Sequence, residues 1–391
     1  MPYFANPKAG PRNVYGPAQQ AVLNDAGLAA ARAEIGSWDG YAPTPLVELP
    51  GLARMAGVGR LFYKDEGGRF GLKSFKALGG AYAVFRLLKT EIERQTGDAG
   101  VTSRDIAGGA YREIVAGITV TCATDGNHGR SVAWGAHTFG CRCVIYIHAH
   151  VSEGRRAAIA HYGAEVERVD GTYDASVRHA AEMATANGWF VVSDTSYPGY
   201  MDVPRDVMQG YTVMAAEAAE QLPDGVVPTH VLVQGGVGGM AAAICSDFWQ
   251  RWGASRPKFI VVEPERADCL YQSALAGQLT PASGDLETMM AGLSCGEVSP
   301  LAWEILATGA DAFMTVPDSA AIDCMRLLAD GDPAVVAGES AVAGLAGLLA
   351  APQEIGVDDG SIVLLFGSEG DTDPELYKEI VGRPADAVRA A

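Results

Sequence analysis

The sequence is poor in basic residues. Of its 391 residues, 29 are Lys or Arg and 47 are Asp or Glu, so the formal net charge is −18 at pH 7. A surface of this charge repels the phosphate backbone of nucleic acids and the head groups of anionic membranes. We therefore expect neither nucleic acid nor membrane as a partner.

Long apolar runs are also missing. No run approaches the roughly 18 residues that cross a bilayer, and Met1–Lys8 lacks the basic and apolar blocks of a secretory signal. We expect a cytoplasmic protein. Internal repeats and low-complexity tracts are absent, and the length, with 48% hydrophobic residues, predicts two domains.

Cysteines are few and scattered. There are seven, an odd number, and their spacing matches no metal site. We expect most of them to be buried thiols. Cys269 and Cys295 lie in a region without a regular pattern, and a disulfide between them stays open, although a reducing compartment disfavours it.

The apolar residues that are present alternate between strand-like and helix-like segments. Strands are expected at 61–64, 117–123, 143–147, 165–169, 189–194, 229–234, 259–264 and 361–366. Helices are expected at 18–35, 81–90, 153–162, 173–187, 203–220, 319–330 and 340–351, and after 240. Residues 91–113 and 266–300 read as irregular. Strands that alternate with helices indicate a parallel sheet.

Lys76 stands where a loop meets a helix. The neighbouring residues Phe75, Ala77 and Leu78 are apolar, so we expect a desolvated amine with a lowered pKa. Such an amine can form a Schiff base with a carbonyl group. A single lysine near a helix start is more often an ordinary surface residue, so this position needs support from other motifs.

A glycine-rich turn follows the expected strand 229–234. It consists of Gly235, Gly236, Val237, Gly238 and Gly239. Glycine lets the backbone approach an anion, and the amides at a helix start bind phosphate. The turn has neither the ending of a P-loop nor the spacing of a dinucleotide fingerprint. Close packing of a helix on a strand would explain the glycines equally well.

Two aspartates follow two other expected strands. Asp125 lies in a turn before a helix, where backbone amides can bind a carboxylate, and Asp194 ends the strand 189–194. Taken alone, Asp125 could simply cap the helix and Asp194 could stabilise a turn.

Together these motifs resemble the fold-type II pyridoxal-phosphate (PLP) enzymes, the tryptophan synthase β-like family of dehydratases, racemases and lyases. Ser74-Phe75-Lys76 before a glycine-rich helix start matches their Schiff-base motif, and the order of motifs matches across about residues 60–375. Within this family the motifs are similar to those of diaminopropionate ammonia-lyases. These motifs are Arg69–Leu72, Ser74–Tyr82, Thr124–Gly129, Asp194–Tyr200 and Ser368–Thr372.

The resemblance implies an α/β fold with two domains, each an open, mostly parallel sheet flanked by helices. Residues 1–95 and 200–391 would form the large PLP-binding domain, and residues 96–199 the small domain. The resemblance also implies a homodimer that acts on a small amino acid.

The resemblance further implies a role for each motif. Lys76 would form the Schiff base with PLP, Asn127 would bind its phenolic oxygen, and Ser368 would face the pyridine nitrogen. A neutral hydroxyl there favours eliminations. The phosphate would be held by Gly235, Gly236, Val237, Gly238 and Gly239. The substrate would be bound by Thr124, Asp125, Gly126, His128 and Asp194, with Lys76, Asp125 and Asp194 as the catalytic groups.

Asp125 departs from the pattern of many relatives. Relatives that dehydrate or racemise serine have Ser-Ser-Gly-Asn-His in this turn, and the second serine is their acid/base group. A carboxylate favours a cationic substrate group such as a β-ammonium. The resemblance therefore implies α,β-elimination of D- or L-2,3-diaminopropionate to pyruvate and two ammonia, with Asp125 and Asp194 acting on opposite faces.

Two alternatives stay open. One is a PLP-dependent dehydratase of a β-hydroxy amino acid such as serine, threonine or hydroxyaspartate. The other is a PLP-binding protein without turnover. Glu369 and Asp371 could orient the loop at the pyridine ring or the substrate.

Overall fold

The computed structural model describes residues 2–10, 14–171 and 173–390, and the chain folds into two compact units. The first unit contains residues 1–25, 43–75 and 214–391, and the second contains residues 26–42 and 76–213. These bounds differ from the predicted large and small domains, 1–95 with 200–391 and 96–199. The helix that begins at Lys76 packs on the helix Asn127–Phe139, so it belongs with the second unit.

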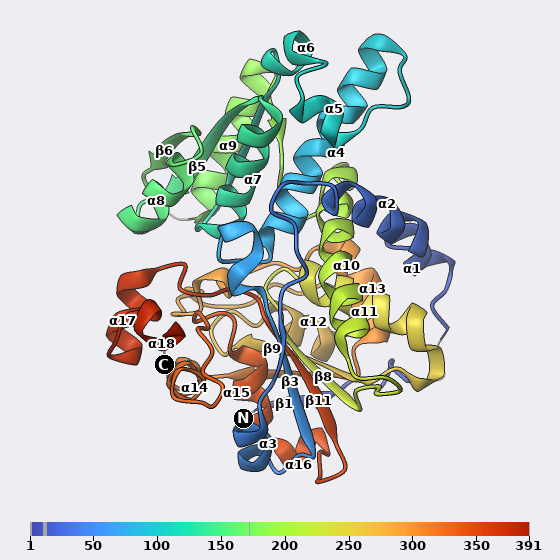
Figure 1. The fold of residues 1–391 in the computed structure, drawn as a ribbon, viewed down its shortest axis with the longest axis vertical. Coiled ribbons are helices and arrows are strands. Elements are labelled where there is room, and N and C mark those ends of the chain that lie inside the picture. The colour runs from blue at the N-terminus through green and yellow to red at the C-terminus, as the bar shows by residue number, and fades with distance from the viewer. Residues whose placement is uncertain (1, 11–13, 172, 391) are drawn as a thin grey trace. The chain divides into compact units, whose positions relative to one another are not determined.

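The first unit is built on one sheet (Figure 1). Among the described residues its strand order is β1-β10-β9-β8-β11-β3-β2. The inner strands pair in parallel, and β1 and β2 add antiparallel edges. The bounds are β1 Tyr3–Ala5, β2 Leu46–Glu48, β3 Arg60–Asp65, β8 His230–Gln234, β9 Lys258–Pro264, β10 Ala312–Val316 and β11 Ile362–Gly367.

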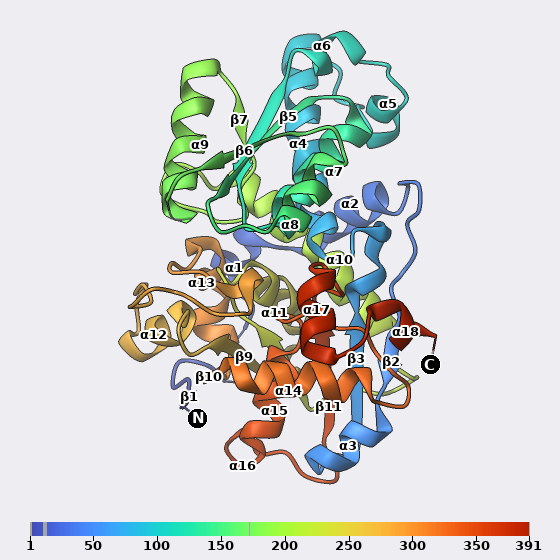
Figure 2. The same ribbon diagram turned by 90° about the vertical axis from the view of Figure 1, so that its left-hand side faces the viewer.

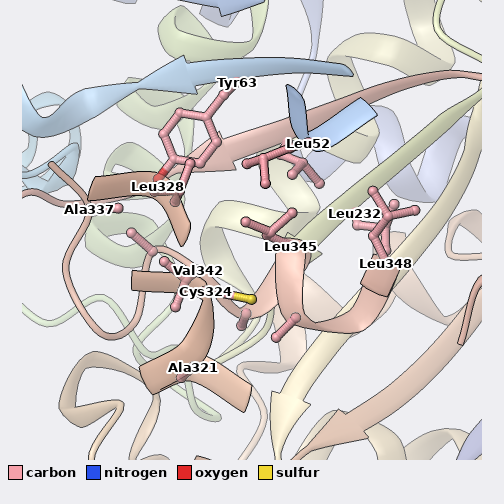
Figure 3. Close-up of a cluster of buried hydrophobic side chains, with 14 of the residues drawn as sticks. Leu52, Tyr63, Leu232, Ala321, Cys324, Leu328, Ala337, Val342, Leu345 and Leu348 are labelled. Carbon is pink, nitrogen blue, oxygen red and sulfur yellow. The ribbon is translucent and has the colours of Figure 1, made fainter. Parts of the chain in front are cut away.

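Helices cover both faces of this sheet. Successive residues of a strand point to opposite faces, and β11 shows both. Leu365 belongs to the apolar cluster that also contains Leu345 and Leu348 of α15, and Figure 3 labels these two leucines. The ring of Phe366 lies 6.1 Å from that of Phe248 in α11. The helices are α1 Pro17–Val22, α3 Pro50–Ala56, η1 Glu66–Gly71, α11 Gly239–Trp252, η2 Gly253–Ser255, α12 Cys269–Ala276, η3 Ala291–Leu293, α13 Pro300–Gly309, α14 Asp318–Ala329, α15 Ala343–Ala350, α16 Pro352–Ile355, α17 Pro374–Val381 and α18 Ala385–Arg389.

The second unit has a smaller sheet. Its described strands are all parallel, in the order β6-β5-β4-β7, and α7 and α9 cover opposite faces (Figure 2). The bounds are β4 Thr119–Ala123, β5 Arg142–His148, β6 Glu165–Val169, β7 Phe190–Val191, α2 Asp25–Ile35, α4 Lys76–Thr96, α5 Ser103–Ala107, α6 Arg112–Ala116, α7 Asn127–Phe139, α8 Glu153–Ala160, α9 Tyr173–Asn187 and α10 Asp202–Gln221, which continues into the first unit.

A glycine explains how closely α4 and α7 pack. A Cβ atom at Gly80 would lie 2.4 Å from the Oγ atom of Ser131, so a larger residue would push the helices apart. The Ser131 hydroxyl donates a 2.6 Å hydrogen bond to the carbonyl oxygen of Lys76. The first turn of α4 is thereby attached to α7.

The predicted α/β class and the mostly parallel sheets are confirmed, and every expected strand is present in some form. Several details were wrong. The expected helix 18–35 is divided into α1 and α2, and the regions 91–113 and 266–300 contain helices. The edge strands β1 and β2 and the inner strand β10 were missed, because three-residue edge strands and a strand in a mixed apolar stretch carry little periodicity.

No helix among the described residues is long and apolar enough to cross a membrane.

A buried network of charges holds the chain that leads to Lys76. The guanidinium of Arg69 binds Glu66 at 2.8 Å and Glu217 at 2.6 Å, and the Nζ atom of Lys64 binds Glu217 at 2.8 Å. All four side chains are almost completely buried. Burial would raise the pKa of Glu217, but Arg69 and Lys64 outweigh it and lower the pKa. Two positive and two negative charges therefore balance inside the first unit.

We expect Glu217→Gln to destabilise the protein strongly. The substitution leaves Arg69 and Lys64 short of one buried negative charge, which typically costs about 3–5 kcal/mol of unfolding free energy. Urea denaturation of the wild type and the variant at equal cofactor loading measures the loss.

Glu48→Gln is the matched control. Glu48 pairs with Arg60 at 2.7 Å, but both side chains are about a third exposed or more, and an exposed pair contributes at most about 1 kcal/mol. Equal losses in the two variants would contradict the role of the buried network.

Candidate active site

In the first unit, three loops follow the carboxyl ends of neighbouring parallel strands. The loop after β8 carries the glycines, the loop after β11 carries Ser368, and β3 leads towards Lys76. The amide of Phe75 donates to the carbonyl oxygen of Ser368 at 3.0 Å, and the amide of Gly370 donates to that of Lys73 at 2.9 Å. The residues just before Lys76 therefore run alongside the Ser368 loop.

A hydrogen bond from Gln234 makes the Ser368 hydroxyl a donor towards any further partner. The Nε2 atom of Gln234 donates to the carbonyl oxygen of Phe366 at 2.9 Å and to the Oγ atom of Ser368 at 2.7 Å. The carbonyl partner fixes the orientation of the amide, since a carbonyl oxygen only accepts. Ser368 Oγ therefore accepts from Gln234 and keeps its own proton for another acceptor. An unprotonated ring nitrogen fits such a donor.

The glycine turn forms a cradle that larger residues would fill. A Cβ atom at Gly235 would lie 2.6 Å from Cγ of Glu263, and one at Gly238 would lie 2.9 Å from Cβ of Ala302. Gly236 and Gly238 have φ angles of +64° and +96°, which favour glycine. The turn ends at the start of α11, whose first amides have no partner within the helix. This arrangement fits a phosphate group.

Glu263 lies against this cradle and is completely buried. It accepts hydrogen bonds from the amides of Leu270 at 3.1 Å and Tyr271 at 2.7 Å. Burial nevertheless raises the pKa of Glu263 to about 8. The carboxyl group is therefore mostly neutral at pH 7, which reduces repulsion of a nearby phosphate.

Cys269 also contacts the glycine turn. Its thiol donates to the carbonyl oxygen of Gly236 at 3.6 Å, and burial raises its pKa above the usual value. Cys269 is a free thiol, so the disulfide with Cys295 that the sequence left open is not formed.

Asp371 and Glu369 are engaged with the protein itself. Asp371 binds Lys73 at 2.6 Å and also pairs with Arg389. Glu369 accepts the amide of Ser340 at 3.1 Å. The Lys73–Asp371 pair attaches the loop before Lys76 to the loop that contains Ser368, in keeping with an orienting role for Asp371.

In the second unit, α4 begins at Lys76 itself, and its amine is paired. The Nζ atom lies 2.5 Å from Oδ2 of Asp194 and 5.8 Å from the ring centre of Tyr211. Burial would raise the pKa of Asp194, but the charge of Lys76 holds it well below its usual value. The sequence predicted a lysine in apolar surroundings. The structure instead shows a carboxylate partner, which favours the ammonium form of Lys76.

His128 lies on the other side of Asp194. Its Nε2 atom is 2.8 Å from the carbonyl oxygen of Val192, and its Nδ1 atom is 3.8 Å from Oδ2 of Asp194. A carbonyl oxygen only accepts, so Nε2 carries the proton and Nδ1 has a lone pair. Burial lowers the pKa of His128, so the imidazole is neutral. Its position beside Asp194 supports the predicted place of His128 in the site.

The turn after β4 is shaped by Thr124. Its Oγ1 atom accepts hydrogen bonds from the amides of Gly126 and Gly129, both at 3.0 Å. A Cβ atom at Gly129 would lie 2.3 Å from Cγ2 of Thr124, so only glycine fits there. The turn presents Asp125, which is half-buried, and leads into α7 at Asn127.

Asp125 has a partner that the sequence did not suggest. Its Oδ1 atom lies 2.7 Å from Nε2 of His148, which ends β5. The predicted site residues thus form two sets in the structure. The first unit holds Ser368 and the glycine turn, and the second holds Lys76, Asp194, His128 and the turn from Thr124 to Asn127.

Comparison with known proteins agrees with this geometry. The family described as "Pyridoxal-phosphate dependent enzyme" matches residues 37–367. The chain belongs to this family. PLP is therefore the cofactor. In the first unit, the shape of the glycine turn fits a phosphate group and the Ser368 hydroxyl fits an unprotonated ring nitrogen. In the second unit, Lys76 has an amine of the kind that forms a Schiff base with a carbonyl group.

Among its relatives are diaminopropionate ammonia-lyases. That of Escherichia coli K12 is 42% identical over 363 residues, covering 89% of each chain, and that of Salmonella typhimurium is 38% identical over 365 residues, covering 88% of this chain and 90% of the relative. The solved holo structure of the Escherichia coli enzyme has a TM-score of 0.88 at 36% identity, over 97% of this chain and 96% of that one.

Reasoning from sequence missed three residues that contact the candidate site residues. Gln234 and Glu263 are polar residues at the ends of apolar strands, and His148 is the last residue of β5. A polar residue that ends a buried strand was the available signal, because strand ends of parallel sheets carry binding groups.

We expect Gly235→Ala to weaken PLP binding. The added methyl group would push against Glu263 and move the cradle, and overpacking of this kind typically costs about 1–3 kcal/mol. A fluorescence titration of the apoenzyme with PLP should show an affinity lower by about 5- to 150-fold. Gly51→Ala is the control, since a Cβ atom there meets nothing within 4 Å. Unchanged affinity in Gly235→Ala would contradict the assignment.

Proposed function

We propose that the protein catalyses the α,β-elimination of ammonia from 2,3-diaminopropionate. With one water consumed, the products are pyruvate and two ammonia. The observation that carries the proposal is Asp125, a carboxylate where many serine-processing relatives have a serine, in a chain that is 42% identical to a diaminopropionate ammonia-lyase. The solved structure of that relative with an aminoacrylate-PLP azomethine intermediate supports an elimination.

Asp125 and Asp194 would remove the α-proton from different isomers of the substrate. Asp125 would accept the α-proton of the D-isomer, and Asp194 or Lys76 that of the L-isomer. Asp194 already binds the Lys76 ammonium at 2.5 Å, so a proton can pass between these two groups. Bound PLP supplies the electron sink for the negative charge left on the α-carbon.

The remaining residues would bind and orient. The glycine turn would hold the phosphate, and Asn127 would bind the phenolic oxygen. The Ser368 hydroxyl would donate a hydrogen bond to the ring nitrogen. A neutral hydroxyl leaves the ring less electron-poor than a carboxylate partner would, which suits elimination. Asp125 and Asp194 would also favour a substrate whose β-amine is protonated, and a protonated amine leaves more easily.

The resemblance to fold-type II enzymes supports a homodimer. Light scattering of the purified protein should give about twice the mass of one chain, which is 40.8 kDa.

We expect pyruvate to form from D- or L-2,3-diaminopropionate, and Lys76→Ala to abolish this turnover because the amine that holds the cofactor is lost. A coupled pyruvate assay beside the visible absorbance of bound PLP measures both. If the protein binds PLP but forms no pyruvate from either isomer, 2,3-diaminopropionate is not its substrate. Pyruvate or 2-oxobutyrate from serine or threonine instead would point to a dehydratase.

We expect Asp125→Asn to separate the two isomers. Loss of a general base lowers the rate by about 10²–10⁴-fold, and kcat/KM should fall by this amount for the D-isomer while the L-isomer is little affected. Asp194→Asn is the matched variant and should act mainly on the L-isomer. Equal losses on both isomers in each variant would contradict the division between two bases.

A further inference from the structure

Asp125 and His148 are brought together by the register of two parallel strands. Ala123 at the end of β4 is paired with Tyr146 in β5. Two residues after Ala123 and Tyr146 come Asp125, in the turn that follows β4, and His148, the last residue of β5. Their side chains meet at 2.7 Å between Oδ1 and Nε2. The side chains are 26% and 18% exposed, so water competes only partly for this hydrogen bond.

The tautomer of His148 is determined by its own loop. The amide of His150 donates to the Nδ1 atom of His148 at 3.3 Å. An acceptor nitrogen carries a lone pair, so the proton of the neutral imidazole lies on Nε2. Neutral His148 therefore donates to Asp125 without needing a second proton.

The other charged groups nearby bind the backbone of these loops. Nη1 of Arg155 lies 3.5 Å from the carbonyl oxygen of Asp125, and Nη1 of Arg168 lies 3.2 Å from that of His148. Arg168 also pairs with Glu153 at 2.6 Å, and the ring of His150 is 6.0 Å from that of His148. These contacts hold the main chain, whereas the hydrogen bond of His148 acts on the carboxylate itself.

We propose that His148 is a positioning residue that prepares Asp125 to act as a base. Its Nε2–H group holds Oδ1, which fixes the plane of the carboxylate and leaves Oδ2 to accept a proton from the substrate. The inference rests on the proposed function, in which Asp125 serves the D-isomer, and it makes His148 a residue that determines stereospecificity.

Two substitutions of His148 separate a hydrogen-bonding role from a merely structural one. The amide nitrogen of glutamine can donate from nearly the same place as Nε2, whereas leucine cannot donate at all. We expect His148→Leu to lower kcat/KM for the D-isomer by about 10- to 100-fold, the usual effect of losing a hydrogen bond to a charged group. His148→Gln should recover most of this loss.

The L-isomer and His150 provide the controls. Turnover of the L-isomer should stay within about twofold in both His148 variants, which also shows that they fold. His150→Leu should leave both isomers nearly unchanged, because the hydrogen bond to Nδ1 of His148 comes from the backbone amide, which leucine keeps. Equal losses with both isomers in His148→Leu, or a His148→Gln variant as impaired as His148→Leu, would overturn the proposal.

A second measurement does not depend on activity. Nitrogen-15 NMR of histidine-labelled protein, with His148→Gln to assign the signal, reports which ring nitrogen carries the proton. We expect a protonated Nε2 and an unprotonated Nδ1 at His148, and the opposite tautomer would overturn the proposal. If the wild type forms pyruvate from neither isomer, the proposed function fails and the catalytic role of His148 fails with it, while the tautomer still shows whether the pair exists.

Discussion

The parallel pairing of the strands is the constraint on which the site depends. Parallel strands have their carboxyl ends on the same side of the sheet, so the loops that follow neighbouring strands lie next to one another there. In the first unit, β11 lies between β8 and β3, and the Ser368 loop therefore contacts both Gln234 and the loop before Lys76. In the second unit, β4 lies between β5 and β7, so its turn faces His148 on one side and Asp194 on the other.

The two aspartates of the second unit have different electrostatic partners. Asp194 is paired with the Lys76 ammonium, and this charge outweighs the effect of burial on its pKa. Asp125 is paired with an imidazole that donates while neutral. One carboxylate is thus paired with the amine proposed to hold the cofactor, and the other with an imidazole. This difference gives a physical reason why the two could serve different isomers of one substrate.

The loop that precedes Lys76 contains residues in unfavourable backbone conformations. Phe70 and Lys73 adopt positive φ angles of 48° and 58°, which side-chain-bearing residues rarely do. The buried pairs of Arg69 with Glu66 and Glu217, and the pair of Lys73 with Asp371, hold this loop in place. The loop before Lys76 therefore has a strained backbone that the ion pairs hold in place. Such strain is common where a reactive group must be kept in one orientation.

The sequence by itself determined the fold class, the strand-to-helix turns and the candidate residues within them, because local periodicity and glycine content are properties of short segments. Lys76, Asp125, Asp194 and the glycine turn lie in such turns, whereas Ser368 and the role expected of each residue came from the resemblance to the fold-type II enzymes. Only the tertiary structure decided which partners these residues have. Lys76 meets Asp194 from 118 residues away, and Asp125 meets His148 only through the register of β4 on β5. A pairing of this kind depends on how strands align in space, and no local pattern in the chain records it.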